Sequence, residues 1–171
     1  MAVTDRNGAS RARFLLNGIP DRFQDFCHMD QITFVQLADW ILENSQSHLS
    51  EDISVEECLF VFLDIVAQGN NFRNAAYGWN HDIQLTQSIF LNIVHALQTL
   101  RQKEDISPSC PNLNTMKKRW RILQSWRPGK SRMDGRVKIG DDGGDGLEMN
   151  QEQLMEALTA LNNFIHEHKE A

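Results

Sequence analysis

Basic and aromatic side chains gather near position 120, and they are the residues of this 171-residue chain best suited to binding phosphates. The group consists of Lys117, Lys118, Arg119 and Arg121, together with Trp120 and Trp126. A short run of this kind is typical of nucleic-acid or phosphate binding, and also of a nuclear import signal. The sequence therefore predicts a candidate DNA contact on a short basic-aromatic helix over residues 116–126.

A second candidate DNA contact lies at about 72–102, where a short helix, a glycine-containing turn and a longer helix are predicted in succession. This order is typical of a helix-turn-helix. Polar side chains at the start of its second helix can contact base edges. These side chains are Gln84, Thr86, Gln87 and Ser88, and Arg73 on the first helix is a further candidate contact.

The charge of this pair of helices argues against a strong DNA contact. Residues 71–102 contain only Arg73, Arg101 and Asp82 as charged groups, a net charge of +1. DNA affinity normally depends on several phosphate contacts from lysine and arginine. Packing within a bundle, or contact with another protein, is therefore the preferred interpretation of the turn.

The first twenty residues are rich in glycine, serine, asparagine and arginine and end at Pro20. We expect a mobile, disordered arm over residues 1–20. Arg6, Arg11 and Arg13 could reach into a DNA groove. An unstructured basic terminus is the more common outcome for such a composition.

Potential metal ligands occur in this sequence only in incomplete sets. Part of the spacing of a calcium-binding loop is formed by Asp141, Asp145, Gly146 and Glu152. Gly143 stands where that loop requires a ligand, so a solvated acidic linker is expected instead. No second pair completes a tetrahedral set with Cys27 and His28, or with His166 and His168. We predict neither a metal site nor a cofactor.

The net charge of −6 conceals a strong segregation along the chain. Residues 1–20 carry +2 and residues 108–140 carry +8, whereas residues 21–107 carry −9 and residues 141–171 carry −7. The acidic main body would repel a polyanion. The sequence has no apolar run long enough to predict a membrane span, and its first residues do not resemble a secretory signal. Three widely spaced cysteines fit reduced thiols, and hence a nuclear or cytoplasmic protein.

Helical periodicity dominates the region from residue 21 to residue 102. A helix at about 30–44 is indicated by apolar residues at spacings of three and four, namely Ile32, Phe34, Leu37, Trp40 and Ile41. Ser54 lies three residues before Glu57, which predicts a capping box. The helix that follows is apolar nearly all round, so we expect it at the centre of the domain, ending near Gly69. Asp82 is the predicted cap of the helix that extends to about Gln102.

The C-terminal part reads as a linker followed by one helix. Residues 103–146 form the linker, which contains the basic-aromatic helix and a glycine- and charge-rich stretch at 127–146 that we expect to be disordered. Arg136 to Ile139 is too short to support a sheet, so no strand is predicted. The C-terminal helix, within 147–171, shows one apolar face made of Leu154, Ala157, Leu158, Leu161 and Ile165. The predicted fold class is therefore all-α.

Two stretches of the chain resemble the two ends of a Harbinger-type transposase. The stretches DRFQDFCHMDQITFVQLADWI, ISVEECLFVFLDIVAQGNNFRNAAYGW and VHALQTL resemble, in order, the N-terminal helical domain of that family and cover about residues 21–102. The stretches MKKRWRIL and EALTALNNFIHEH resemble the end of its catalytic domain. Asn162 stands where the family usually has histidine, whereas Asn163, Phe164 and Ile165 match.

The catalytic middle of such a transposase has no counterpart in this chain. The resemblance would imply an RNase-H-like domain whose Asp-Asp-Glu triad binds two divalent metal ions and cleaves phosphodiesters. Only residues 107–116 join the two matching stretches, and the position expected for the glutamate holds Cys110. No catalytic role is therefore assigned to any residue. With the sheet missing, we expect Trp120, Ile122 and Leu123 to pack on the N-terminal bundle or stay exposed.

The sequence thus predicts a non-catalytic remnant of a Harbinger-type transposase, acting as a DNA-associated or protein-interaction module. The partners that the resemblance implies are transposon-end DNA, an intact transposase, or its Myb-like partner protein. Two alternatives stay open at this point. The first is a metal-dependent nuclease of the Asp-Asp-Glu type, and the second is a truncated gene product without function.

Overall fold

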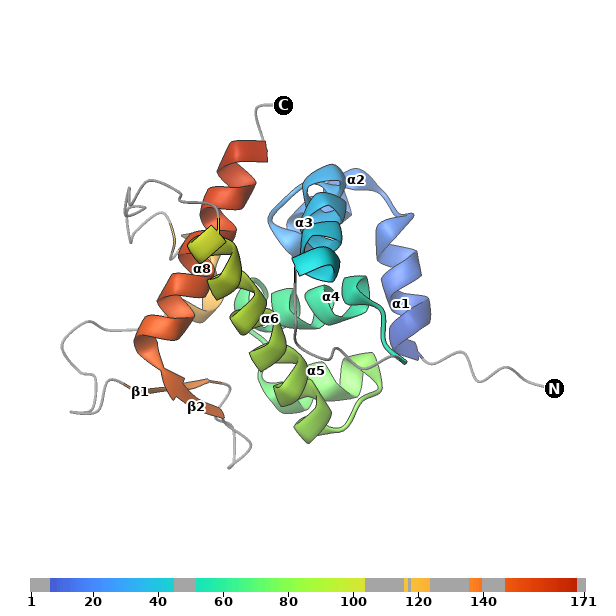
Figure 1. Cartoon of the computed structure of the whole chain (residues 1–171). Helices are drawn as coiled ribbons and strands as arrows, with labels where there is room; N and C mark the ends of the chain where they lie inside the picture. Colours follow the sequence, from blue (N-terminus) through green and yellow to red (C-terminus); the bar gives the residue numbers. More distant parts are fainter. Residues whose placement is uncertain are drawn as a thin grey trace.

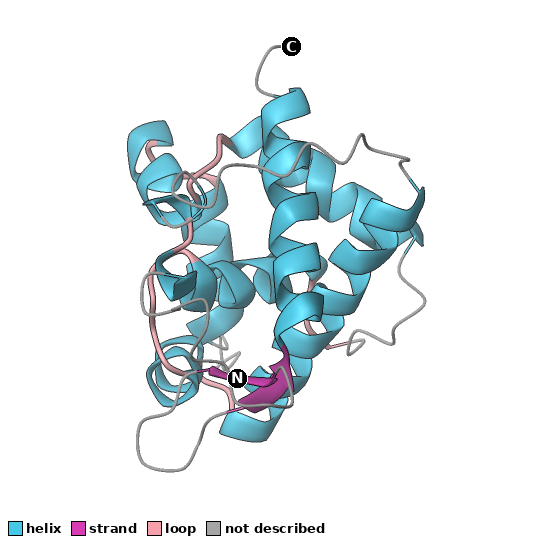
Figure 2. Ribbon diagram, turned by 90° about the vertical axis from the view of Figure 1, so that its left-hand side faces the viewer, coloured by secondary structure: helices cyan, strands magenta, loops and turns pink. Residues whose placement is uncertain are grey.

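The computed structural model describes residues 7–44, 52–103, 116, 118–123, 136–139 and 147–168. Helices make up nearly all of these segments, so the fold is all-α, as predicted (Figure 1, Figure 2). The elements in chain order are α1 (Asn7–Leu16), α2 (Pro20–Cys27), α3 (Gln31–Asn44), α4 (Val55–Val66), α5 (Phe72–Trp79), α6 (Ile83–Lys103), the 3-10 turn η1 (Arg121–Leu123), β1 (Arg136–Ile139), β2 (Leu147–Asn150) and α8 (Gln151–His168).

Helix α4 lies at the centre of the bundle, between α1 and α6 in Figure 1. It begins at the predicted cap, because the Ser54 hydroxyl oxygen accepts a hydrogen bond from the backbone N–H of Glu57 at 3.2 Å. All of its residues except Glu56 are buried. The chain turns after this helix at Gly69, whose φ of 78° is a backbone conformation that residues with a side chain rarely adopt. The prediction of a central helix that is apolar all round is confirmed.

Aromatic rings connect the N-terminal helices through this centre. The Phe60 ring on α4 lies 4.4 Å from that of Phe34 on α3 and 5.8 Å from that of Phe23 on α2, between ring centres. It also stacks on Trp79 of α5 at 5.9 Å. Buried ring pairs of this kind add to the stabilisation that comes from burying their area.

The helix-turn-helix order is present at α5 and α6. The Asn71 side chain caps α5, and Asn80 ends it in the left-handed conformation with φ of 57°. The Asp82 carboxylate accepts a hydrogen bond from the backbone N–H of Leu85 at 2.7 Å, as its predicted capping role requires. Helix α5 ends at Trp79, directly before Asn80.

The prediction of a disordered arm over residues 1–20 is wrong for residues 7–20, where helix α1 forms, and residues 1–6 lie outside the described residues. Helix α1 packs against α4 and α5, with Ala12 buried. The guanidinium carbon of Arg11 lies 4.4 Å from the centre of the Trp79 ring, which is cation–π geometry. The composition of this segment predicted mobility, but contacts to residues far along the chain hold it. Arg6 lies outside the described residues.

The C-terminal helix is docked on the bundle. Helix α8 runs along α6 on the side away from α1 (Figure 1). Its predicted apolar face is buried, as expected, and comprises Leu154, Ala157, Leu158, Leu161 and Ile165.

A β-hairpin corrects the prediction that the chain contains no strand. Strands β1 and β2 pair antiparallel, with Arg136 opposite Asn150 and Ile139 opposite Leu147. Ile139 and Met149 are buried in the same core as the helices. A four-residue strand is too short to be recognised alone, and it is stabilised here by its distant partner strand. The expected disorder at 127–146 is wrong for 136–139, and the rest of that stretch lies outside the described residues.

The segment around Trp120 also packs on the bundle. Trp120 and Leu123 are fully or almost fully buried, and Ile122 is partly buried against the core. The Trp120 ring stacks near His28, which follows α2, with ring centres 6.2 Å apart. Of the two outcomes expected for these residues, packing on the N-terminal bundle is the one observed. Trp126, Asp141, Asp145 and Gly146 lie outside the described residues.

Candidate functional site

One of the predicted base-reading residues of α6 is buried, whereas Gln84, Gln87 and Ser88 fall on one face of the helix at spacings of three and four. Thr86 is fully buried, and its hydroxyl donates to the backbone carbonyl of Asp82 at 2.9 Å, so its assignment as a DNA contact is wrong. Gln84 is exposed, Gln87 is half-buried, and Arg73 is exposed on α5. The helical period turns Thr86 toward the core because α6 buries its N-terminal turn against its neighbours.

Helix α6 is a scaffold helix, since it packs against α3, α4, α5 and α8. Its exposed side chains over 83–102 are Gln84, Ser88, His95 and Gln102, and none of them is a lysine or arginine. A helix that enters a DNA groove needs free flanks and nearby cations for the phosphates. Within 83–102, the one cation of α6 is Arg101, which is half-buried, and four neighbouring helices pack against α6.

Arg119, the central cation of the basic-aromatic segment, makes its hydrogen bond within the protein. The Arg119 guanidinium donates a hydrogen bond to Oδ1 of Asn162 on α8, and burial lowers the pKa of Arg119 below its ordinary value. The carbonyl oxygen of Arg119 accepts a hydrogen bond from Nδ1 of His28. Arg119 therefore fastens the end of α2 to α8, and it is not part of an open phosphate site.

The other cations of this segment do not converge on one site. Lys118 is exposed. Arg121 is exposed too, but its side chain lies over Gly69 and Nη1 donates to the carbonyl oxygen of Gln68 at 3.4 Å. Lys117 lies outside the described residues. The predicted patch is therefore divided between an internal clasp and separate surface charges.

A buried polar layer, missed at the level of the sequence, joins α4 to α5. Oε1 of Glu57 lies 2.7 Å from Nε2 of His81, and both side chains are almost completely buried. The Asp64 carboxylate accepts hydrogen bonds from Nε1 of Trp79 at 3.0 Å and from Nδ2 of Asn70 at 2.5 Å. Each carboxylate thus has its partner, which is what a buried acid requires.

This layer is structural in its geometry. Glu57 and Asp64 are seven residues apart on one helix and are held by different partners, so they do not share a site. Within the described segments, no three histidine, cysteine or acidic side chains come together as metal ligands would. The capping box predicted a reach of Glu57 back to Ser54, but its carboxylate is instead engaged by His81.

Two cysteines are buried free thiols in the core. Desolvation raises the pKa of Cys27 well above its ordinary value. Burial, with a smaller contribution from the neighbouring Glu57, raises the pKa of Cys58 to about 12. Neither thiol has the exposed, electropositive surroundings of a reactive cysteine.

The exposed face of α3 is the feature of the described surface that packing leaves unexplained. Ile32 is 73% exposed, Leu42 is 67% exposed and Val35 is 43% exposed. The opposite face of α3, with Phe34, Leu37 and Ile41, is fully buried. Periodicity alone grouped Ile32 with these core residues, because a spacing of three or four does not say which neighbouring stripe faces inward.

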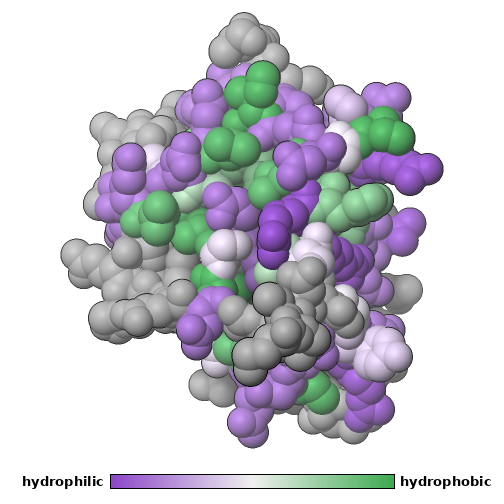
Figure 3. Space-filling model, turned by 90° about the vertical axis from the view of Figure 1, so that its right-hand side faces the viewer, coloured by the Kyte–Doolittle hydropathy of each residue, from purple (hydrophilic) through white to green (hydrophobic). Residues whose placement is uncertain are grey.

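Further apolar side chains lie beside this face at the junction of α1 and α2. Nε2 of Gln31 donates to the carbonyl oxygens of Leu16 and Gly18, at 3.1 Å and 3.3 Å. These bonds hold the first residue of α3 against the connection that carries Ile19, which is 56% exposed. On the face that carries α1, hydrophobic groups stand between hydrophilic ones (Figure 3).

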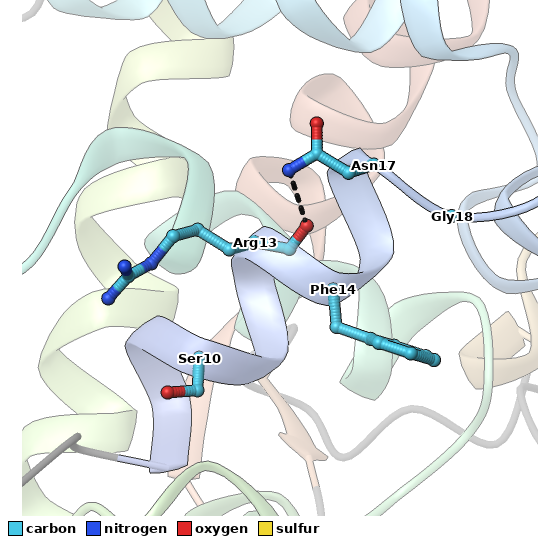
Figure 4. A pocket seen from close by; sticks show the side chains of 5 residues that line it. All are labelled: Ser10, Arg13, Phe14, Asn17 and Gly18. Atoms are coloured by element: carbon cyan, nitrogen blue, oxygen red, sulfur yellow. Dashed lines mark hydrogen bonds between the residues drawn. The ribbon is translucent and has the colours of Figure 1, made fainter.

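A shallow hollow of about 420 Å³ follows the outer side of α1. Its lining residues are Ser10, Arg13, Phe14, Asn17 and Gly18. The Phe14 ring, 70% exposed, points away from the Arg13 side chain, and Asn17 caps the turn by donating to the carbonyl oxygen of Arg13 at 3.0 Å (Figure 4). The lining has no acid and no nucleophile other than a serine hydroxyl, so it suits contact better than catalysis.

Acidic side chains outnumber basic ones in the segment that contains α2 and α3. Residues 20–44 contain five acids and one arginine, a net charge of −4, and all six side chains are exposed. They are Asp21, Arg22, Asp25, Asp30, Asp39 and Glu43. This sign of charge repels phosphate and attracts cations. An apolar stripe with a charged border is the usual make-up of a protein-binding surface.

Comparison with known proteins gives one match. A family model described as a domain of unknown function (DUF8040) matches residues 4–101. No curated protein and no solved structure matches the sequence. The matched range contains α1 to α5 and all but the last two residues of α6, whereas the hairpin and α8 lie beyond it. No described helix is long and apolar enough to cross a membrane.

Proposed function

Since the chain belongs to the DUF8040 family, whose description states no activity, we propose its function from the structure. It is a non-catalytic helical module, derived from a Harbinger-type transposase, and it acts by binding another protein. The resemblance supplies the origin, and the arrangement of buried and exposed side chains supports the mode of action.

The observation that carries this proposal is the closed core. The two stretches that resemble the ends of a transposase pack against each other, α8 on α6 and Trp120 beside His28. Trp120, Leu158 and Leu161 belong to the same hydrophobic cluster as α4. The described helices therefore bury the apolar faces of α4, α6 and α8 against one another in a single core, as a stable module must.

Charge and burial favour a protein partner over DNA. The basic residues that the sequence favoured for phosphate binding do not form one open site. Arg119 bonds to Asn162 on α8, and Arg121 bonds to the carbonyl oxygen of Gln68. The exposed apolar side chains of α3 stand in acidic surroundings, which disfavour phosphate binding. The partners that the resemblance implies are an intact transposase and its Myb-like companion. The two buried thiols are in keeping with action in the nucleus or cytoplasm.

Two assays on the whole chain test the proposal. Supercoiled plasmid incubated with the purified protein and Mg²⁺ or Mn²⁺ should stay intact, because no catalytic carboxylates are expected to converge. The protein should bind purified intact transposase or its Myb-like companion in a titration, and should bind transposon-end DNA weakly with a shallow dependence on salt. Metal-dependent nicking, or a steep salt dependence of tight DNA binding with no protein binding, would contradict it.

A further inference from the structure

Resting on the proposed function, we infer that α3 docks a helix of the partner protein by coiled-coil packing. The partner helix presents lysine or arginine opposite Asp39. The juxtaposition that leads to this inference is an exposed stripe of three apolar side chains interrupted by one acid on a helix whose other face is fully buried.

The spacing of the exposed stripe is that of a coiled-coil seam. Ile32, Val35, Asp39 and Leu42 follow one another at intervals of three, four and three residues. Those intervals place them at successive a and d positions of two heptads. With Ile32 at a, the d positions hold Val35 and Leu42, and Asp39 takes the second a position. Such a seam packs into the holes of a facing helix.

The remaining positions of α3 agree with this assignment. The core residues Thr33, Phe34, Leu37, Ala38 and Ile41 fall at b, c, f and g, so the bundle holds α3 from the opposite side and leaves its seam open. The flanking e positions carry Gln36 and Glu43, which are both exposed. In coiled coils the e and g positions select the partner by charge.

Asp39, the acid within the seam, determines which charge the partner helix must carry. Asp39 would be desolvated by a facing helix, which is costly unless a cation pairs with it. Five exposed acids against one arginine over residues 20–44 attract a basic segment by long-range electrostatics as well. The partner helix therefore combines apolar a and d residues with lysine or arginine at its central a position and its edges.

A second copy of this chain is a poor occupant of the same seam. Parallel pairing would place Asp39 against Asp39, and antiparallel pairing would bury it against Val35. Both arrangements bury an uncompensated charge. The seam is therefore built for a different protein, and the full chain should be a monomer.

The test uses the full chain and two synthetic helical peptides of three heptads each. Both peptides carry isoleucine and leucine at a and d. The basic peptide has lysine at its central a position and at e and g, whereas the acidic peptide has glutamate there. Fluorescence anisotropy should show the basic peptide binding at least about tenfold more tightly than the acidic one.

Variants then locate the contact on the protein. The charge reversal Asp39→Lys should invert the preference between the two peptides. The double variant Ile32→Ala, Leu42→Ala should weaken binding of the basic peptide by about tenfold or more. Tyr77→Ala is the matched control, because Tyr77 is 90% exposed on α5 and lies outside the seam. All four substitutions in these three variants affect exposed side chains, and circular dichroism checks that the fold is kept.

Several results would overturn the inference. They are equal affinity for the two peptides, binding of neither, an effect of Tyr77→Ala as large as that of the double variant, or a dimer in sedimentation that Asp39→Lys alters. If the chain still captures the intact transposase or its Myb-like companion while α3 binds no peptide, only this inference fails. Plasmid nicking would refute the proposed function independently of α3.

Discussion

Oε1 of Glu57 lies 2.7 Å from Nε2 of His81, inside the bundle where α4 meets the turn between α5 and α6. The pair links the central helix to the connection that would otherwise be an exposed turn. Both groups are almost fully buried, so each needs the other.

Replacing this carboxylate should destabilise the protein measurably. Glu57→Ala leaves the His81 imidazole without its buried acceptor, which costs about 1–3 kcal/mol in the free energy of unfolding. Glu57→Gln keeps an acceptor oxygen and should lose less. Urea unfolding followed by circular dichroism measures both variants. Glu56→Ala, at the half-exposed neighbouring position, is the control, and an equal loss there would argue against a special role for the pair.

The packing of α1 gives a prediction in which two effects oppose each other. Alanine is favoured over glycine in a helix by about 1 kcal/mol. At Gly8, however, a Cβ atom would clash with Oε1 of Glu57 and would lie 2.6 Å from the carbonyl oxygen of Trp79. Overpacking of this kind costs about 1–3 kcal/mol. Gly8→Ala should therefore lower the midpoint of thermal unfolding, because steric strain outweighs propensity.

The matched change in the same helix is Ser10→Ala, at a half-buried position beside the hollow on α1. It should leave the unfolding midpoint nearly unchanged. If Gly8→Ala raises the midpoint instead, α1 behaves as the free arm that its composition predicted, and its packing on α4 is wrong.

The clasp between Arg119 and Asn162 should contribute to stability rather than to DNA binding. Asn162→Ala removes the acceptor of a half-buried guanidinium and should lower the free energy of unfolding by about 1–3 kcal/mol. Asn163→Ala, one position along α8 and half-buried, serves as the control. Gel shifts with transposon-end DNA should be the same for both variants. A selective loss of DNA binding in Asn162→Ala would reopen the phosphate-binding interpretation of the segment.

Cys58 gives a pH dependence whose sign follows from its raised pKa. The folded thiol has a pKa of about 12 against an ordinary value of 9.0, so the unfolded chain loses its proton first as pH rises. The contribution of the protonated Cys58 thiol to the free energy of unfolding is fully present below pH 9. It is lost as pH rises toward 12, at up to about 1.4 kcal/mol per pH unit. Between pH 8 and pH 10.5, the wild type should thus lose more stability than Cys58→Ala. Parallel pH profiles for the two proteins would contradict this assignment.

Local signals in the sequence were sufficient for most of the helices. The caps at Ser54 and Asp82 and the turn at Gly69 lie where they were predicted, because a cap or a left-handed turn depends on residues three or four positions away. The all-round apolar pattern of 55–66 likewise placed α4 at the centre, since such a helix has no face suited to water. The buried face of α8 follows from the same periodicity.

Only the tertiary structure decided what the individual candidate residues do. Thr86 is buried, Arg119 is drawn into a contact with α8, and Ile32 is left in solvent, although their local patterns suggest the reverse. The helix at 7–16 and the strand at 136–139 exist because partners far along the chain cover or pair with them. The physical reason is that periodicity shows which side chains share a face of one helix. Whether that face is buried depends on which distant element packs against it.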